Sequence, residues 1–235
     1  ETIKAAYARL EKMPVATRKD AEAWLEAWSE VMSAVQEKQS RAYFAMTRNT
    51  KDEAAMKEYE RMAGEVMPLV GELDDSMKKR FMTLPEEWTP KDFGIARKNI
   101  QCAVELYRKE NLPLLSEEMI LKSQYQKMSG GWETEFQGER VTPQRLNPFL
   151  KSPNRELREK AWRARVGMHY ADRDKLDQLF DNMLKLRKQL AANAGMKTYL
   201  DYRYKELNRL SYTRKDTKAF RDAIHKFVVP AVTKM

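Results

Sequence analysis

One amphipathic stretch between residues 17 and 49 constrains the fold of this chain more than any other feature. Its apolar residues recur at steps of three and four, which is the period of an α-helix with one buried face. Thr17 or Asp20 can cap the start of this helix, and Asn49 marks its end. The stripe contains Trp24, Leu25, Trp28, Val31, Met32, Val35, Ala42, Tyr43 and Met46. A buried packing seam explains this pattern better than a cofactor site.

The same period over most of the remaining sequence predicts an all-α protein. Residues 51–84 read as a second helical stretch, which Pro68 should kink or split, because proline lacks a backbone donor and clashes with the preceding turn. Residues 174–195 carry another stripe, which Gly195 should close in the left-handed conformation. That stripe contains Leu176, Leu179, Phe180, Met183, Leu184, Leu190 and Ala191.

Hydroxyl side chains and prolines indicate where the other helices begin. We expect starts at Thr89-Pro90, at Ser116 after a break at Asn111-Leu112-Pro113, and at Ser152-Pro153, because these residues cap helices or fit their first turn. Thr213 should cap the last helix, whose apolar residues are Phe220, Ile224, Phe227 and Val228.

The period changes in one place, near residues 132–142. Large residues alternate with acids from Trp132 to Phe136, and Gln137-Gly138 forms a turn before the chain returns. This pattern predicts one small β-hairpin. Because an isolated hairpin is marginally stable in water, it should pack on helices through Trp132 and Phe136.

Composition excludes several classes of protein. No run approaches the roughly 20 apolar residues of a membrane span. The formal charge is +9, from 44 Lys and Arg against 35 Asp and Glu, but most basic residues alternate with acids, as on solvated helix faces. This alternation disfavours a nucleic-acid groove. Cys102 is the only cysteine, so an internal disulfide is impossible and a cytoplasmic location is the simplest expectation.

Both ends of the sequence look cut. The chain starts without an initiator methionine and without an apolar signal core, and it stops at residue 235 in helix-compatible sequence. We therefore expect a piece of a longer protein.

No complete catalytic or metal site is visible. A zinc peptidase needs His-Glu-x-x-His on a helix, and neither His169 nor His225 is followed by that pattern. Cys102 lies in an apolar helical stretch, which favours an inert buried thiol. Nucleophile elbows and phosphate loops are also absent from the sequence. We therefore predict no catalytic residue and no metal ligand.

The best candidate for ligand contact is an aromatic cluster near residue 200. Tyr199, Tyr202 and Tyr204 lie close to Arg203, and rings beside a guanidinium can hold a peptide or a nucleic-acid strand. Ordinary packing with the hydroxyls at the surface explains the same residues and is the more common case.

Four segments together resemble oligoendopeptidase F-like zinc metallopeptidases, of the thimet-oligopeptidase type. They are residues 107–146, with ENLPLLSEEM and GGWETEFQGERVTP; SPNRELREKAWRAR at 152–165; LRKQLAANAGMKTYLDYRYKELNRLSYT at 186–213; and FRDAIHKFVVPAV at 220–232. Their order and spacing agree with the N-terminal part of that family from about residue 24 onward.

The resemblance implies a largely helical architecture around a channel that admits short peptides. In that family a zinc ion supplies the chemistry, and its ligands lie in the C-terminal half, so no residue here inherits a catalytic role. We expect lobes at 1–110 and 111–235, with Tyr199, Tyr202, Arg203 and Tyr204 as channel contacts. The partners would be short peptides and the missing catalytic half, and the exposed apolar surface would allow self-association. The alternatives are a non-catalytic scaffold that binds peptides or proteins, and a nucleic-acid-binding domain, which the charge alone indicates.

Overall fold

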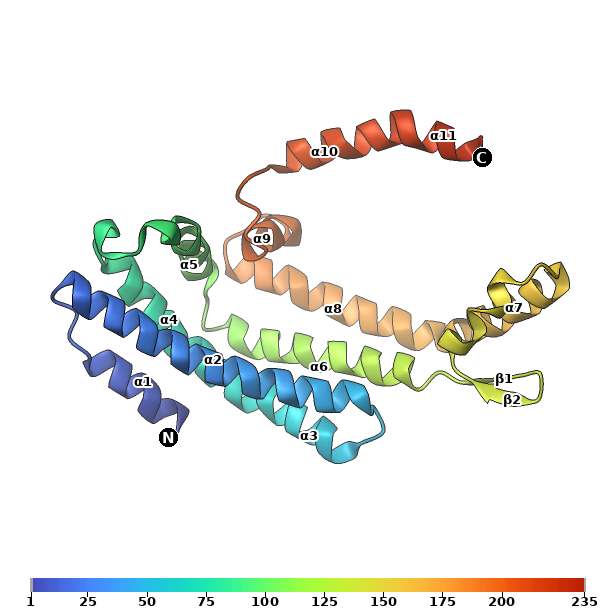
Figure 1. Cartoon of the computed structure of the whole chain (residues 1–235), viewed down its shortest axis with the longest axis horizontal. Helices are drawn as coiled ribbons and strands as arrows, with labels where there is room; N and C mark the ends of the chain where they lie inside the picture. Colours follow the sequence, from blue (N-terminus) through green and yellow to red (C-terminus); the bar gives the residue numbers. More distant parts are fainter. Residues whose placement is uncertain (1, 235) are drawn as a thin grey trace.

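The computed structural model describes residues 2–234 of the chain, and helices of all kinds cover 79% of them. The predicted all-α fold is therefore confirmed. Within this range no helix is both long enough and apolar enough to cross a membrane. The chain forms an open C shape, in which an elongated body carries a separate C-terminal arm (Figure 1).

The first part of the body is built on α2 (Arg18–Arg48), which has the predicted extent. Thr17 caps it, and the Asp20 carboxylate bonds back to the Thr17 amide, so both proposed capping residues contribute to one capping box. Trp24 and Trp28 pack against α1 (Ile3–Lys12) and α4 (Met67–Thr83) in a shared core. The indole of Trp28 donates to Asp74 Oδ1 at 2.8 Å, which satisfies a buried carboxylate.

Pro68 divides the second stretch, as predicted. α3 (Glu53–Arg61) passes through a π-helical turn at Met62–Val66 into α4. Met67, just before the proline, donates to the carbonyl five residues back. The same arrangement recurs in the arm, where the π turn Ile224–Val228 precedes Pro230. In both places the wider turn accommodates a residue that cannot donate.

Three predicted helix starts differ from the structure, at Ser116, at Ser152-Pro153 and at Thr89-Pro90. α6 (Asn111–Gly130) begins at Asn111 rather than at Ser116, because Pro113 lies in the first turn, where its missing N–H would have no partner anyway. Ser116 is interior and donates to the Leu112 carbonyl. α7 (Arg155–Ala171) is capped by Asn154, not by Ser152-Pro153, since the Asn154 side chain accepts from Leu157 N.

Earlier in the chain, α5 (Gly94–Leu106) follows two short 3₁₀ turns at Glu86–Trp88 and Lys91–Phe93. The residues after Thr89-Pro90 therefore form a 3₁₀ turn, and the α-helix itself begins at Gly94.

The predicted hairpin is confirmed and is the one sheet among residues 2–234. β1 (Thr134–Phe136) pairs antiparallel with β2 (Glu139–Val141), with Thr134 opposite Val141. Gln137 and Gly138 both have positive φ, as a tight hairpin turn requires. Trp132 and Phe136 bury their rings against α7, which supports the hairpin.

α6 lies alongside α8 (Arg173–Asn193), which forms the spine of the second part of the body (Figure 1). Gly195 has φ +72° and ends α8 as predicted. The α8 stripe is only partly buried: Leu190 is in the core, but Phe180 is 61% exposed and Leu184 is also exposed.

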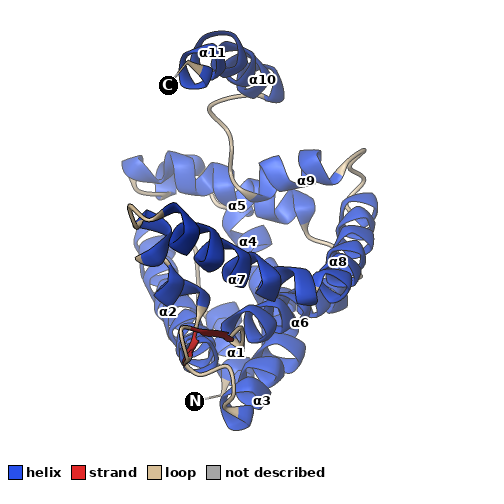
Figure 2. Ribbon diagram, turned by 90° about the vertical axis from the view of Figure 1, so that its right-hand side faces the viewer, coloured by secondary structure: helices blue, strands red, loops and turns tan. Residues whose placement is uncertain are grey.

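The chain then continues through α9 (Tyr199–Glu206) into the arm, which consists of α10 (Arg214–Ala223), the π turn and α11 (Val229–Thr233). Thr213 caps α10 in a capping box with Asp216, as predicted. Figure 2 shows the arm standing clear of the body and joined to it through one extended loop.

Candidate functional site

The aromatic cluster predicted from the sequence lies on α9, at the junction between the body and the arm. Gly195 turns the chain back after α8, and Thr198 caps α9 by accepting from Asp201 N at 3.2 Å. These two local signals set where α9 begins.

Tyr199 and Tyr202 lie together. Their rings stack with centroids 5.9 Å apart, and Tyr202 packs against Leu106 and Ala191 in a small core. Burial, together with the nearby Glu206 carboxylate, raises the pKa of the Tyr202 hydroxyl to about 12. Tyr202 is only 4% exposed, so Tyr199 stacks on a ring that is itself buried.

A charged network that the sequence analysis missed lies beneath Tyr199. The Arg187 guanidinium is 5.5 Å from the centre of the Tyr199 ring, and its Nε donates to Glu118 Oε1 at 2.8 Å. Lys122 Nζ is 3.1 Å from the other Glu118 oxygen. Burial alone would raise the pKa of Glu118, but Arg187 and Lys122 outweigh it and hold this pKa below its usual value.

No local pattern marks this network, because Glu118 and Arg187 are 69 residues apart in the chain. The helix start expected at Ser116 would put Glu118 in the first turn of that helix. The longer α6 places it in the interface with α8 instead. The two partners become recognisable only when the pairing of α6 with α8 is known.

The other two candidate residues face different neighbours. Arg203 pairs with Glu206 one turn along α9. The Tyr204 hydroxyl is 2.7 Å from Thr217 Oγ1 in the arm, and Arg209 lies over its ring at 4.9 Å. Asp201 Oδ1 accepts a hydrogen bond from Arg214 Nη1 of the arm at 2.8 Å. The structure therefore places Tyr199, Tyr202 and Arg203 on α9, which packs on α8 and α5, whereas Tyr204 links α9 to the arm.

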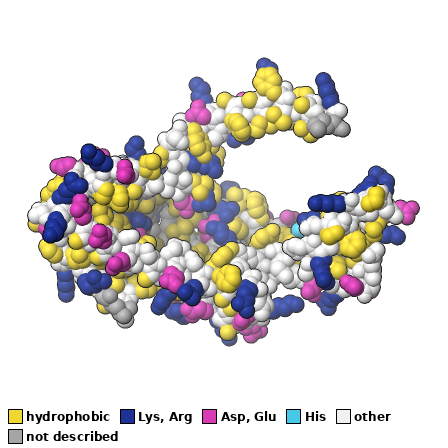
Figure 3. All heavy atoms as spheres, viewed as in Figure 1, with side chains coloured by type: hydrophobic (Ala, Val, Ile, Leu, Met, Phe, Trp, Pro, Cys, Tyr) yellow, Lys and Arg dark blue, Asp and Glu magenta, His cyan; other side chains and the backbone are white. Residues whose placement is uncertain are grey.

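The arm and the body enclose a deep hollow that is open on one side (Figure 3). Hydrophobic side chains cover much of the face of the arm that borders it. On the arm, Phe220 and Phe227 are 68% and 66% exposed. Exposed aromatic residues on α7 and α8, which the sequence did not single out as surface residues, add to the uncovered apolar area: Trp162, Tyr170 and Phe180. Uncovered apolar area of this kind marks a surface that packs against something else.

The side chains that the structure describes do not fit a zinc site. Within residues 2–234, no three His, Cys, Asp or Glu side chains come together to hold a metal ion. His169 on α7 and His225 in the arm are both exposed and belong to separate elements. Cys102 is buried, which raises the pKa of its thiol and disfavours a reactive thiolate. No hydrolytic step can therefore be derived from these residues.

Two sequence-family matches decide the relationship. Residues 1–91 match the Peptidase M3 N-terminal domain, and residues 149–235 match Peptidase family M3. The chain belongs to peptidase family M3. The two M3 matches lie in chain order and leave only the α5–α6 and hairpin region between them, so the resemblance predicted from the sequence is confirmed.

Solved structures show the same fold. An oligoendopeptidase F structure from Bacillus anthracis str. Ames superposes with a TM-score of 0.93 at 20% identity, over 99% of this chain and 43% of that one. Pz peptidase A with an inhibitor gives a TM-score of 0.92 at 22% identity, over 97% of this chain and 41% of that one. A comparison with curated protein sequences found no match. The chain thus spans about two fifths of the M3-type structures that it matches.

Proposed function

We propose that this chain is the N-terminal part of a zinc-dependent oligoendopeptidase and forms a wall of the channel that admits short peptides. One observation carries the proposal: both M3 matches fall on a chain that folds as about two fifths of oligoendopeptidase F-type structures. The catalytic motif and the zinc ligands would belong to the other part. In this proposal the chain itself contributes shape and substrate contacts and holds no zinc.

The exposed apolar surface supports this role. The apolar face of the arm borders the hollow and has no partner among the described residues (Figure 3). A surface of this kind fits a missing catalytic half better than it fits a closed scaffold with a polar exterior. The same surface would favour self-association of the isolated chain.

We assign the peptide contacts to α9. Tyr199 is half-buried above Arg187, and Arg203 lies one turn further along the helix. At such a place the aromatic ring can pack against a peptide side chain, and the guanidinium can pair with a peptide carboxylate. Tyr204 would act at the edge of this surface, while Tyr202 supports Tyr199 from below.

The proposal includes a division of the chain into lobes at 1–110 and 111–235. It is supported by the pairing of α6 with α8, which joins residues Asn111 and Leu190 through a side chain-to-backbone hydrogen bond of 3.1 Å. A cytoplasmic location agrees with the single buried Cys102.

The decisive experiment is complementation. The 235-residue chain is mixed with the separately produced catalytic half that the proposal assigns to the same protein, and cleavage of a fluorogenic peptide is followed with and without a chelator. We expect no turnover and no stoichiometric zinc for the chain alone, and chelator-sensitive turnover for the mixture. Chelator-sensitive cleavage by the purified chain alone would falsify the assignment of the chemistry to the other part.

The alternative is a helical scaffold that binds peptides or proteins without cleaving them. If the two parts do not associate and the chain binds short peptides by itself, the scaffold is the better description. A lack of both association and peptide binding would contradict both functions.

A further inference from the structure

A cavity of about 410 Å³ lies at the opposite end of α8 from the aromatic cluster. The 21 residues of α8 separate the two places by about 30 Å, at 1.5 Å per residue. Three helices end at this cavity: α2 at Arg48, α6 at Gly130 and α7 at Ala171. It is therefore distinct from the surface that we assign to peptide contact on α9.

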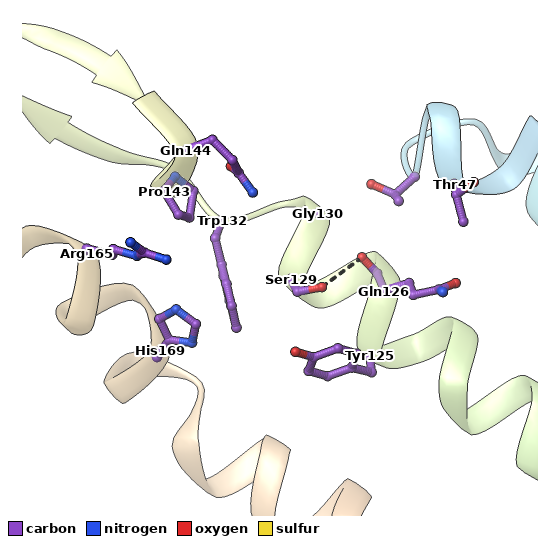
Figure 4. A pocket seen from close by; sticks show the side chains of 11 residues that line it. Thr47, Tyr125, Gln126, Ser129, Gly130, Trp132, Pro143, Gln144, Arg165 and His169 are labelled. Atoms are coloured by element: carbon purple, nitrogen blue, oxygen red, sulfur yellow. Dashed lines mark hydrogen bonds between the residues drawn. The ribbon is translucent and has the colours of Figure 1, made fainter. Parts of the chain in front are cut away.

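Trp132 forms the central wall of the cavity, and two contacts fix its position (Figure 4). Its ring packs on His169 with centroids 4.0 Å apart, and its Nε1 donates to Asp172 Oδ2 at 2.9 Å. Lys175 pairs with the other oxygen of Asp172 at 2.9 Å. These contacts fix the indole in place with 9% of its surface exposed, and the Asp172 carboxylate behind it is already paired with Lys175.

The polar groups around Trp132 come from both sides. Arg165 and His169 lie one turn apart on α7, and Figure 4 shows them on one side of the indole, with Tyr125 and Ser129 of α6 on the other. Gln144, after the hairpin, points its amide toward the same space. The remaining lining residues are Thr47, Thr50, Gln126, Gly130 and Pro143.

Among the residues that line the cavity, the permanent charge is positive. Arg165 is a permanent cation, hydroxyl and amide groups supply neutral donors, and no Asp or Glu lines the cavity. Arg165 Nη1 donates to Asn147 Oδ1 at 2.9 Å, which orients the guanidinium and leaves other N–H groups for a ligand. A planar guanidinium beside a flat aromatic wall matches a carboxylate attached to an apolar or aromatic group.

We propose that this cavity is a carboxylate-binding site, in which Arg165 holds the carboxylate and Trp132 packs against the group that carries it. His169 can donate through a ring N–H, and the Gln144 amide can complete the hydrogen bonds of a ligand of amino-acid size. Two sources share this chemistry: a free small carboxylate and the C-terminus of a peptide. The site requires no catalytic half, so it stands whether or not the chain belongs to a working peptidase.

The test uses the full 235-residue chain and three probes. These are N-acetyl-phenylalanine, its C-terminal amide, and an acetylated tripeptide that ends in phenylalanine with a free carboxylate. Binding is measured by calorimetry and by the shift of the Trp132 indole N–H signal in NMR spectra, which is assigned from Trp132→Phe. We expect the free acid to bind and shift that signal, and the amide to bind at least about tenfold weaker, a difference of about 1.4 kcal/mol.

Two variants locate the contact. Arg165→Gln should weaken binding of the free acid at least about tenfold, whereas Arg163→Gln should leave it unchanged, because Arg163 pairs with Glu159 and does not line the cavity. Tighter binding of the tripeptide identifies a peptide C-terminus as the ligand, and tighter binding of the single residue identifies a free carboxylate. An unshifted Trp132 signal, or equal binding of acid and amide, overturns the proposal without relying on any variant. Neither result bears on the complementation experiment.

Discussion

Arg187 Nε lies 2.8 Å from Oε1 of Glu118, and this pair joins α8 to α6 through a carboxylate that is only 6% exposed. Tyr199 rests against the same guanidinium, so the surface that we assign to peptide contact is held by a buried ion pair rather than by packing alone. Lys122 supports the carboxylate from its own helix. α9 packs on α8 and α5, and its contact with Arg187 brings it to a pair of residues that are distant in sequence.

Replacing Arg187 by Met should lower the free energy of unfolding by about 2 kcal/mol. Breaking a buried pair costs about 3–5 kcal/mol when the other charge is left alone, but here Lys122 stays beside Glu118. Chemical denaturation measures the change, and Lys188→Met on the exposed side of α8 provides the control. A loss as small as that of the control would show that the pair is not stabilising.

The same pair should make stability depend on acid pH. The pKa of Glu118 is lowered in the folded state, so its contribution is present above the ordinary carboxyl range and is lost as pH falls through the lowered pKa. Glu118→Gln should flatten this part of the curve of unfolding free energy against pH. Denaturation series at several acidic pH values would detect the flattening, and parallel curves for the two proteins would contradict it.

The buried hydroxyl of Tyr202 should make the stability of the chain depend on alkaline pH. Burial raises its pKa to about 12, whereas an unfolded tyrosine titrates near about 10. Its contribution to stability is therefore fully present below about pH 10 and is lost as pH rises toward about 12. Tyr202→Phe should remove this part of the alkaline loss. The outcome that argues against a buried hydroxyl is a variant whose stability declines with pH as steeply as that of the parent chain.

Replacing Gly195 and Gly167 by alanine should change stability in opposite directions, because only Gly195 has a positive φ. Gly195 has φ +72°, so Gly195→Ala should lower the free energy of unfolding by about 1 kcal/mol, through strain alone, because no atom lies within 4 Å of the added methyl group. Gly167 sits inside α7 with similar free space, so Gly167→Ala should raise stability by about 0.5–1 kcal/mol. Thermal melting of both variants tests the prediction, and changes of the same sign would refute it.

The exposed rings of the arm should affect dye binding and self-association of the chain but not its free energy of unfolding. Phe220→Ser and Phe227→Ser together should reduce hydrophobic-dye binding and self-association of the chain, because both rings are exposed. The free energy of unfolding should change by less than about 0.5 kcal/mol, as for other surface sites. Leu190→Ala, in the core, should instead cost about 2–5 kcal/mol. Dye fluorescence and light scattering provide the readouts; undiminished dye binding would place the exposed apolar surface elsewhere.

Local chemistry was sufficient to predict much of this fold. Thr17 and Thr213 cap helices where the sequence placed them, Gly195 ends α8 with positive φ, and Gln137-Gly138 turns the hairpin. Each of these features depends on one side chain and the backbone within a few residues of it. The same locality explains the errors at Ser116 and Ser152: several adjacent residues could begin a helix, and tertiary packing selects among them.

The sequence by itself determined that the chain is helical, that helices end at Asn49 and Gly195, that it resembles M3 peptidases, and that its own residues lack a metal-binding motif. Only the tertiary structure decided that Glu118 meets Arg187, that Phe180 and the arm remain exposed, and that Arg165 and Trp132 border one cavity. The reason is physical. Caps, turns and helical periods depend on neighbours along the chain, whereas burial and charge pairing depend on which helix faces lie against each other. An amphipathic stripe shows that a face is apolar, but it does not show whether this chain or another part of the protein covers that face.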